Sequence, residues 1–180
     1  RVITREFAGE LATLEKVAPH FHLSLQSGCD ETLKRMNRKY SAAEYKEKCD
    51  ILREVYDNPA LTTDVICGFP GETEEEFTES FEFVKDIGFY EMHVFKYSRR
   101  HGTVADKMPN QIPEKIKTER SKKLIALSEK MSADYIESMK GKEAKIILED
   151  EAVENDVRGR VGFSAHYIKV FVPGDKAQGE

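Results

Sequence analysis

The stretch from Leu61 to Thr73 limits the possible folds more than any other part of the chain, because three local signals follow one another in it. A short run rich in β-branched residues predicts a strand. The turn Gly-Phe-Pro-Gly-Glu comes next, and Thr73 with Glu76 has the spacing of a capping box that opens a helix. Strand, tight turn and helix in this order predict one unit of an α/β fold.

The turn in this stretch suits a ligand as well as a chain reversal. Gly68 and Gly71 allow a positive φ or a close approach of the backbone to a ligand, and Pro70 fixes its own φ between them. In a parallel sheet such a turn lies at the carboxyl end of a strand, where ligands bind. Glycine turns also join strands to helices without any ligand, so the pattern alone leaves both interpretations open.

Two further strands are predicted, from His20 to Gln26 and from Glu91 to Tyr97. A capping box at Ser41 and Glu44 opens a helix between the first two strands, and Gly88 ends a helix between the second and third. The order strand, helix, strand, helix, strand has connections long enough for parallel crossovers. The sequence therefore predicts a parallel sheet with outer helices.

The strand predicted at residues 20–26 has one entirely polar face. Its alternating residues divide into Phe21, Leu23 and Leu25 on one side and His20, His22, Ser24 and Gln26 on the other. A strand covered by helices on both sides should be apolar throughout. The polar side predicts a barrel lumen or cleft that holds a polar ligand, and the alternative is an edge strand with one solvent-exposed face.

After a long helix predicted from Glu114 to Lys140, the pattern changes at Gly141. Short strands are predicted at Ala144–Leu148, Arg158–Phe163 and Tyr167–Val172, with turn residues at Glu149–Asp156 and after Val172. We expect a domain of residues 1–140 followed by a small, truncated β-barrel module of residues 141–180.

Composition restricts the class of protein. Of the 180 residues, 39% are hydrophobic and 34% charged, and no apolar run approaches the ~20 residues that span a bilayer. The net charge of −5 argues against a chain that is basic all over. Residues 96–123 nevertheless hold nine Lys or Arg against three acids, a local charge of +6 that can meet phosphates or simply cover solvated helix faces.

Cys29, Cys49 and Cys67 lie about twenty residues apart, with no second Cys or His at ligand spacing. We therefore expect no metal site built on them and interpret them as buried thiols. An odd number of cysteines without a secretory signal favours a reducing compartment, the cytoplasm. Because the chain starts Arg-Val-Ile-Thr-Arg, without an initiator Met, we expect an excised fragment.

Several long motifs together resemble the radical SAM methylthiotransferases. The motifs are His22-Leu-Ser-Leu-Gln-Ser-Gly-Cys-Asp30 with Leu33-Lys-Arg-Met-Asn-Arg-Lys-Tyr40, Thr62-Thr-Asp-Val-Ile-Cys-Gly-Phe-Pro-Gly-Glu-Thr73, and Val94-Phe-Lys-Tyr-Ser-Arg-Arg-His-Gly-Thr103. Residues 141–172 are similar to the TRAM domain that ends these enzymes. The phrase His93-Val-Phe-Lys-Tyr-Ser is most similar to the subgroup that acts on threonylcarbamoyladenosine in tRNA.

The resemblance implies the C-terminal half of a radical SAM partial (β/α) barrel and a tRNA-binding TRAM module. It implies an enzyme that attaches a methylthio group beside the anticodon, using S-adenosylmethionine and two [4Fe-4S] clusters. The cofactor-binding residues it implies are Ser24, Gln26, Arg38, Asp64, Gly68, Phe69, Pro70, Gly71 and Glu72, with Glu72 orienting the turn or capping the next helix. For RNA contacts we expect Arg99, Arg100, Lys142, Arg160, Tyr167 and Lys169.

The chain departs from this family in its cysteines, because it has no Cys-x-x-x-Cys-x-x-Cys loop and none of the cysteines of a second cluster. We therefore expect no catalytic residue, no metal and no activity in this chain alone. Its expected partners are tRNA, the N-terminal half of the same protein and, to cover an exposed sheet edge, a second copy of the fragment.

Three alternatives stay open. The first is a ribosomal-protein methylthiotransferase, because those enzymes carry a motif similar to the one that begins at residue 93 of this chain. A stand-alone RNA-binding module would use the basic loop around Arg99 and Arg100 together with the β module. A phosphate-binding α/β enzyme would use the glycine turn as an anion cradle, but the turn has no Lys and four glutamates follow it closely.

Overall fold

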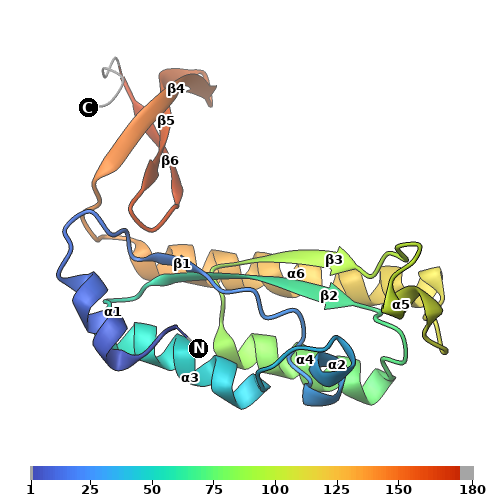
Figure 1. Cartoon of the computed structure of the whole chain (residues 1–180). Helices are drawn as coiled ribbons and strands as arrows, with labels where there is room; N and C mark the ends of the chain where they lie inside the picture. Colours follow the sequence, from blue (N-terminus) through green and yellow to red (C-terminus); the bar gives the residue numbers. More distant parts are fainter. Residues whose placement is uncertain (1, 175–180) are drawn as a thin grey trace.

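The computed structural model describes residues 2–174, which form two separate three-stranded sheets (Figure 1). The first sheet is parallel in the order β1-β2-β3, with β1 at His20–His22, β2 at Ala60–Cys67 and β3 at Glu91–Lys96. Its long helices are α3 (Ala42–Val55), α4 (Glu74–Ile87) and α6 (Glu114–Met139), and the short ones are α1 (Arg5–Ala12), α2 (Asp30–Arg35) and α5 (Val104–Lys107). The predicted parallel α/β order is confirmed.

The helix ends follow the local signals. The Ser41 hydroxyl accepts from the Glu44 backbone N–H while the Glu44 carboxylate accepts from the Ser41 N–H, which makes a complete capping box at the start of α3. Thr73 and Glu76 make the same reciprocal pair at the start of α4. Helix α4 ends at Gly88, whose φ of 65° lies in the left-handed region that favours glycine.

The core lies on one face of the parallel sheet. Leu61, Val65 and Cys67 of β2 are almost completely buried there, in a cluster with Leu52 of α3 and Leu124 of α6. Figure 1 shows α3 and α4 lying along this sheet on one side. The opposite face leaves His93 exposed and Phe95 51% exposed. One face of the sheet is therefore packed and the other is open.

The strand predicted from His20 to Gln26 is wrong in length, because β1 ends at His22. The Thr63 hydroxyl of β2 lies between β2 and the segment that follows β1, where it donates to the Leu23 carbonyl and accepts from the Leu25 N–H. These two bonds replace part of the strand ladder. At Gln26 the backbone turns to a φ of 72° and makes only an isolated bridge to β2.

The second sheet is antiparallel in the order β4-β5-β6, with β4 at Ile146–Glu154, β5 at Val157–Ser164 and β6 at Lys169–Pro173. The turn predicted at Glu149–Asp156 is wrong, since β4 continues to Glu154 after a bulge and the chain reverses at Asn155 and Asp156, both with positive φ. Within residues 2–174 the sheet is an open meander, and positions 175–180 of the predicted module lie outside the described residues.

No helix among the described residues is both long enough and apolar enough to cross a membrane.

Candidate functional site

The glycine turn lies at the carboxyl end of β2, as predicted. Gly68 and Gly71 have φ values of 74° and 81°, so both positions need glycine for backbone reasons. The Phe69 ring is buried against the Tyr97 ring, with the centroids 5.2 Å apart. The Gly71 N–H donates to the Asn110 carbonyl at 2.9 Å, so the segment after β3 holds the turn as well.

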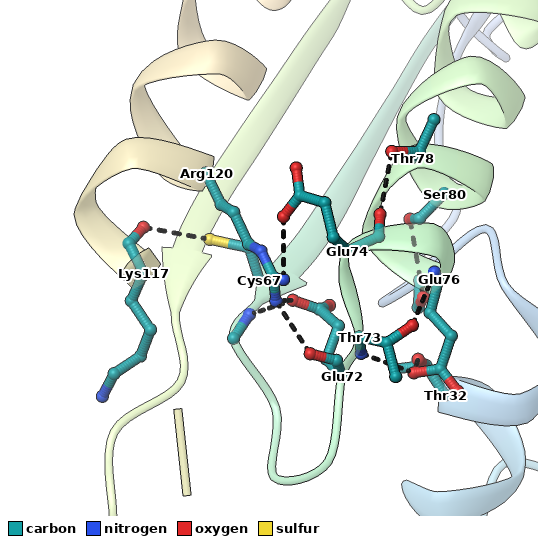
Figure 2. Close-up of polar contacts among 12 residues, drawn as sticks. Thr32, Cys67, Glu72, Thr73, Glu74, Glu76, Thr78, Ser80, Lys117 and Arg120 are labelled. Atoms are coloured by element: carbon teal, nitrogen blue, oxygen red, sulfur yellow. Dashed lines mark hydrogen bonds and ion pairs between the residues drawn. The ribbon is translucent and has the colours of Figure 1, made fainter. Parts of the chain in front are cut away.

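Glu72 holds this turn from inside the protein (Figure 2). Its Oε2 accepts from the Gly68 N–H at 2.7 Å and from Nη1 of Arg120 at 2.6 Å. The side chains of Glu72 and Arg120 are only 2% and 5% exposed. The pKa of Glu72 is raised overall, because burial raises it by more than the Gly68 N–H and the guanidinium lower it. The carboxylate therefore orients the turn, one of the two roles expected for Glu72, and its contacts are within the protein.

Arg120 links the Glu72 carboxylate to the start of helix α4, and this residue was not predicted from the sequence. Besides Oε2, its guanidinium donates to the Glu72 carbonyl at 3.1 Å and to the Glu74 carboxylate at 3.0 Å. The missed signal was its spacing: Arg120 lies four residues before Leu124 and eleven before Met131, on the buried side of α6. A charged residue on that side needs a buried partner.

A second polar group lies on the open face of the sheet, and we call His22, Ser24, Asp64 and His93 the open-face cluster. Ser24 Oγ donates to Asp64 Oδ2 at 2.8 Å, and His22 Nε2 lies 3.2 Å from the same oxygen. His22 Nδ1 lies 3.0 Å from the Thr62 hydroxyl. The His22 and His93 rings are 5.9 Å apart between centroids. The predicted polar face of the first strand thus continues across all three strands.

The pKa of Asp64 is lowered in this cluster. Burial by itself would raise the pKa, but the hydrogen bonds with Ser24 and His22 lower it by more, together with the charge interactions with His22 and His93. The carboxylate therefore stays ionised at neutral pH and offers negative charge to a ligand on the open face.

The other predicted cofactor-binding residues are more scattered. Gln26 is 9% exposed, and its backbone N–H and carbonyl bond to Asp64 and Ile66 across the gap to β2. Arg38 has an exposed side chain in the loop between α2 and α3. Pro70 is buried within the turn. The structure therefore brings Ser24 and Asp64 together, and within residues 2–174 no hydrogen bond or ion pair joins Arg38 to that pair.

The three cysteines are free and buried, as expected. Burial is the first cause that raises the pKa of all three thiols, to about 11 for Cys49 and Cys67. Among residues 2–174, the one group of three side chains with metal-ligating atoms close together is His22, Asp64 and His93, without a cysteine. These thiols do not fit the ligand set of an iron–sulfur cluster, which is built from several thiolates.

The expected RNA-binding residues fall at two ends of the parallel sheet (Figure 1). Arg99 and Arg100 are exposed after β3, and Arg99 is paired with Asp106 at 2.9 Å. Tyr167 lies at the other end, stacked between His20 at the start of β1 and Phe163, with centroid distances of 5.1 and 4.7 Å.

The remaining three of these residues belong to the Tyr167 end or to the second sheet. Lys142 lies 3.5 Å from Asp57, Arg160 donates to the Glu149 carbonyl, and Lys169 is exposed on β6. The structure therefore separates the basic loop from the β module, and the two do not form one continuous surface.

Comparison with known proteins agrees with this geometry. The family model of the radical SAM superfamily matches residues 1–84. A threonylcarbamoyladenosine tRNA methylthiotransferase of Bacillus subtilis is 40% identical over 96% of this chain and 38% of its own length. Over most of its length this chain is therefore similar to radical SAM methylthiotransferases.

Other relatives of this chain are named for a different modified base. A tRNA-2-methylthio-N(6)-dimethylallyladenosine synthase of Thermoanaerobacter sp. is 41% identical over 82% of this chain and 31% of its own length. The chain thus spans about a third of the length of these curated relatives. Among solved structures, Escherichia coli coproporphyrinogen III oxidase, a radical SAM enzyme, matches 73% of the chain with a TM-score of 0.60 and 19% identity, which supports the partial-barrel fold.

Proposed function

We propose that this chain is part of a tRNA methylthiotransferase and that its open face receives S-adenosylmethionine. The observation that carries the proposal is the open-face cluster, in a chain about 40% identical to such enzymes, together with the glycine turn at the carboxyl side of the same parallel sheet. Ligands of open and barrel-like α/β folds bind at this side.

The residues of this chain suit the polar parts of the cofactor. S-adenosylmethionine would supply the radical for the reaction when it is bound. Ser24 and the ionised Asp64 would bind its hydroxyl or amino groups, and the backbone from Gly68 to Gly71 would lie against the adenosyl part. Glu72 and Arg120 position that turn from behind. The exposed guanidinium of Arg38 would pair with the cofactor carboxylate.

For the substrate, we propose N6-threonylcarbamoyladenosine in tRNA. The support is the extent of the match, 96% of the chain for the B. subtilis relative of that specificity and 82% for the dimethylallyladenosine synthase. A relative from Aquifex aeolicus that is named for the same substrate is 42% identical over 82% of the chain. Modification of dimethylallyladenosine is the second candidate, favoured by 41% identity to that synthase.

We further propose that residues 1–140 are the barrel part and residues 141–180 a TRAM-like module that contacts tRNA. Both iron–sulfur clusters would be held by residues outside these 180, because the three buried thiols do not fit them. The free thiols support a cytoplasmic location. The chain alone would then be inactive.

The experiment that tests the proposed function uses a host that lacks its own tRNA methylthiotransferases. The natural gene that encodes this chain is expressed there, and the nucleosides of total tRNA are measured by mass spectrometry. We expect the methylthio derivative of threonylcarbamoyladenosine, and its loss with Asp64→Asn. Detection of the methylthio derivative of dimethylallyladenosine would favour the second candidate substrate. The absence of any methylthio nucleoside would contradict the proposed function.

The inactivity of the chain alone has a direct test. After anaerobic reconstitution with iron and sulfide, the 180-residue chain should show no absorption of a thiolate-bound cluster between about 380 and 420 nm. Such a band, retained after gel filtration, would show that the buried cysteines do bind a cluster.

A further inference from the structure

The open-face cluster contains a set of metal-ligating atoms that the proposed function does not use as such. One ligand atom each from His22, Asp64 and His93 lies within 4.8 Å of the others. The arrangement follows from the sheet. Asp64 of β2 is the register partner of His93 on β3, and His22 on β1 is the partner of Thr62, two residues before Asp64 and on the same face.

The chemistry of these three atoms suits one class of ion. Two imidazole nitrogens and one carboxylate oxygen form the donor set of Zn²⁺ and of divalent iron, cobalt or nickel sites, whereas Mg²⁺ and Ca²⁺ prefer oxygen ligands. The 3.2 Å between His22 Nε2 and Asp64 Oδ2 is close to the edge of about 3.4 Å of a tetrahedron with Zn–ligand bonds of about 2.1 Å. Two of the three ligands are therefore already at coordination spacing.

Two neighbouring hydroxyl groups orient these ligands. Thr62 Oγ1 lies 3.0 Å from His22 Nδ1, which leaves Nε2 directed at Asp64, and Ser24 Oγ donates to the Asp64 carboxylate. Such outer contacts to ligating histidines and carboxylates are the usual support of protein metal sites. His93 is exposed, and among the described residues its imidazole has no hydrogen bond, so the ring can turn to complete the set.

We propose that His22, Asp64 and His93 bind one divalent transition-metal ion, with Zn²⁺ as the reference ion. Three ligands from one face leave at least one coordination position open. A hydroxyl or amino group of a nucleoside can occupy that position, so the ion and the proposed cofactor can share the face. The inference does not depend on the proposed function, since its test needs neither cofactor nor tRNA.

The experiment is isothermal titration of ZnCl2 into the tag-free 180-residue chain, with Co²⁺ absorption as a second readout. We expect one site per chain, and a Co²⁺ spectrum without the thiolate charge-transfer band that cysteine ligation would give. His22→Ala, Asp64→Asn and His93→Ala should each weaken binding at least ~100-fold, because three ligands are the minimum for such a site. The matched control is His101→Ala, a fully exposed histidine outside the cluster, which should leave the affinity unchanged.

A conservative variant tests the geometry of the site. Thr62→Val keeps the shape of the side chain but removes the hydroxyl beside His22, and should weaken Zn²⁺ binding by ~10-fold, the usual effect of losing an outer contact. Circular dichroism of each variant checks that the fold is kept. A chain that binds no Zn²⁺, or binds it equally well with all three ligand variants folded, would overturn the proposal.

Discussion

At the scale of single residues, the buried pair of Glu72 and Arg120 is the most sensitive point of the turn. Arg120→Met would leave the Glu72 carboxylate buried without its cation, and breaking a buried pair costs about 3–5 kcal/mol. We expect a loss of that size in the free energy of urea unfolding. The double variant Glu72→Gln/Arg120→Met removes both charges and should recover part of the loss.

The control for this prediction is Lys85→Ala. Lys85 is paired with Glu82 on α4, but both side chains are more than half exposed. Exposed pairs contribute little to stability, so the unfolding midpoint should not move. An equal loss in the Lys85 and Arg120 variants would show that burial of the Glu72 pair has no special effect.

Asp64 gives the residue-scale prediction for pH. Its pKa is lowered in the fold, so the stability that its ionised form contributes is complete above the ordinary aspartate pKa and is lost as the pH falls through the folded-state value. Ser24→Ala removes one hydrogen bond to the carboxylate and should move the Asp64 pKa upward. A carbon-13 NMR titration of the carboxyl group measures this shift, and an unchanged or lower pKa would contradict the assignment.

At the scale of elements, Thr63 joins β1 to β2 where the strand ladder stops. Its hydroxyl bonds both to the Leu23 carbonyl and to the Leu25 N–H, and the side chain is fully buried. Thr63→Val keeps the shape and leaves those backbone groups without this partner, so unfolding should become easier by about 1–3 kcal/mol. Thr62→Val is the matched control, since that hydroxyl bonds only to a half-exposed imidazole. Equal effects of the two substitutions would contradict this role.

The same elements show what the sequence could predict. The capping boxes at Ser41 and Thr73 and the stop at Gly88 were predictable because each signal acts within a few residues. The early end of β1 was not, because the competing hydroxyl of Thr63 comes from forty residues further along the chain. The reversal at Asn155 and Asp156 was missed although both residue types tolerate positive φ.

The site was predictable in part for the same reason. Ser24 and Asp64 were expected on the open face from the alternation and the resemblance, and the structure brings them within hydrogen-bond distance. His93 was overlooked, although it alternates with the buried Met92 on the third strand. Its approach to Asp64 depends on the register between β2 and β3, which no local pattern encodes.

At the scale of the whole molecule, the residues proposed to contact tRNA lie at the two ends of the parallel sheet. Arg99 and Arg100 lie beyond β3, and Lys142 and Lys169 belong to the other end and the second sheet. Because substitutions at distant sites usually add in free energy, Arg99→Ala/Arg100→Ala and Lys142→Ala/Lys169→Ala should each weaken tRNA binding, and the fourfold variant by the product of the two factors.

Fluorescence anisotropy with labelled tRNA at several salt concentrations measures these affinities. Each lost phosphate contact should reduce the slope of log affinity against log salt by about one. Lys46→Ala/Lys85→Ala, on α3 and α4, is the matched control and should keep the slope of the unchanged chain. If only one end lowers the slope, tRNA binds at that end alone. If neither does, the basic residues cover solvated helix faces and tRNA is not recognised by this chain.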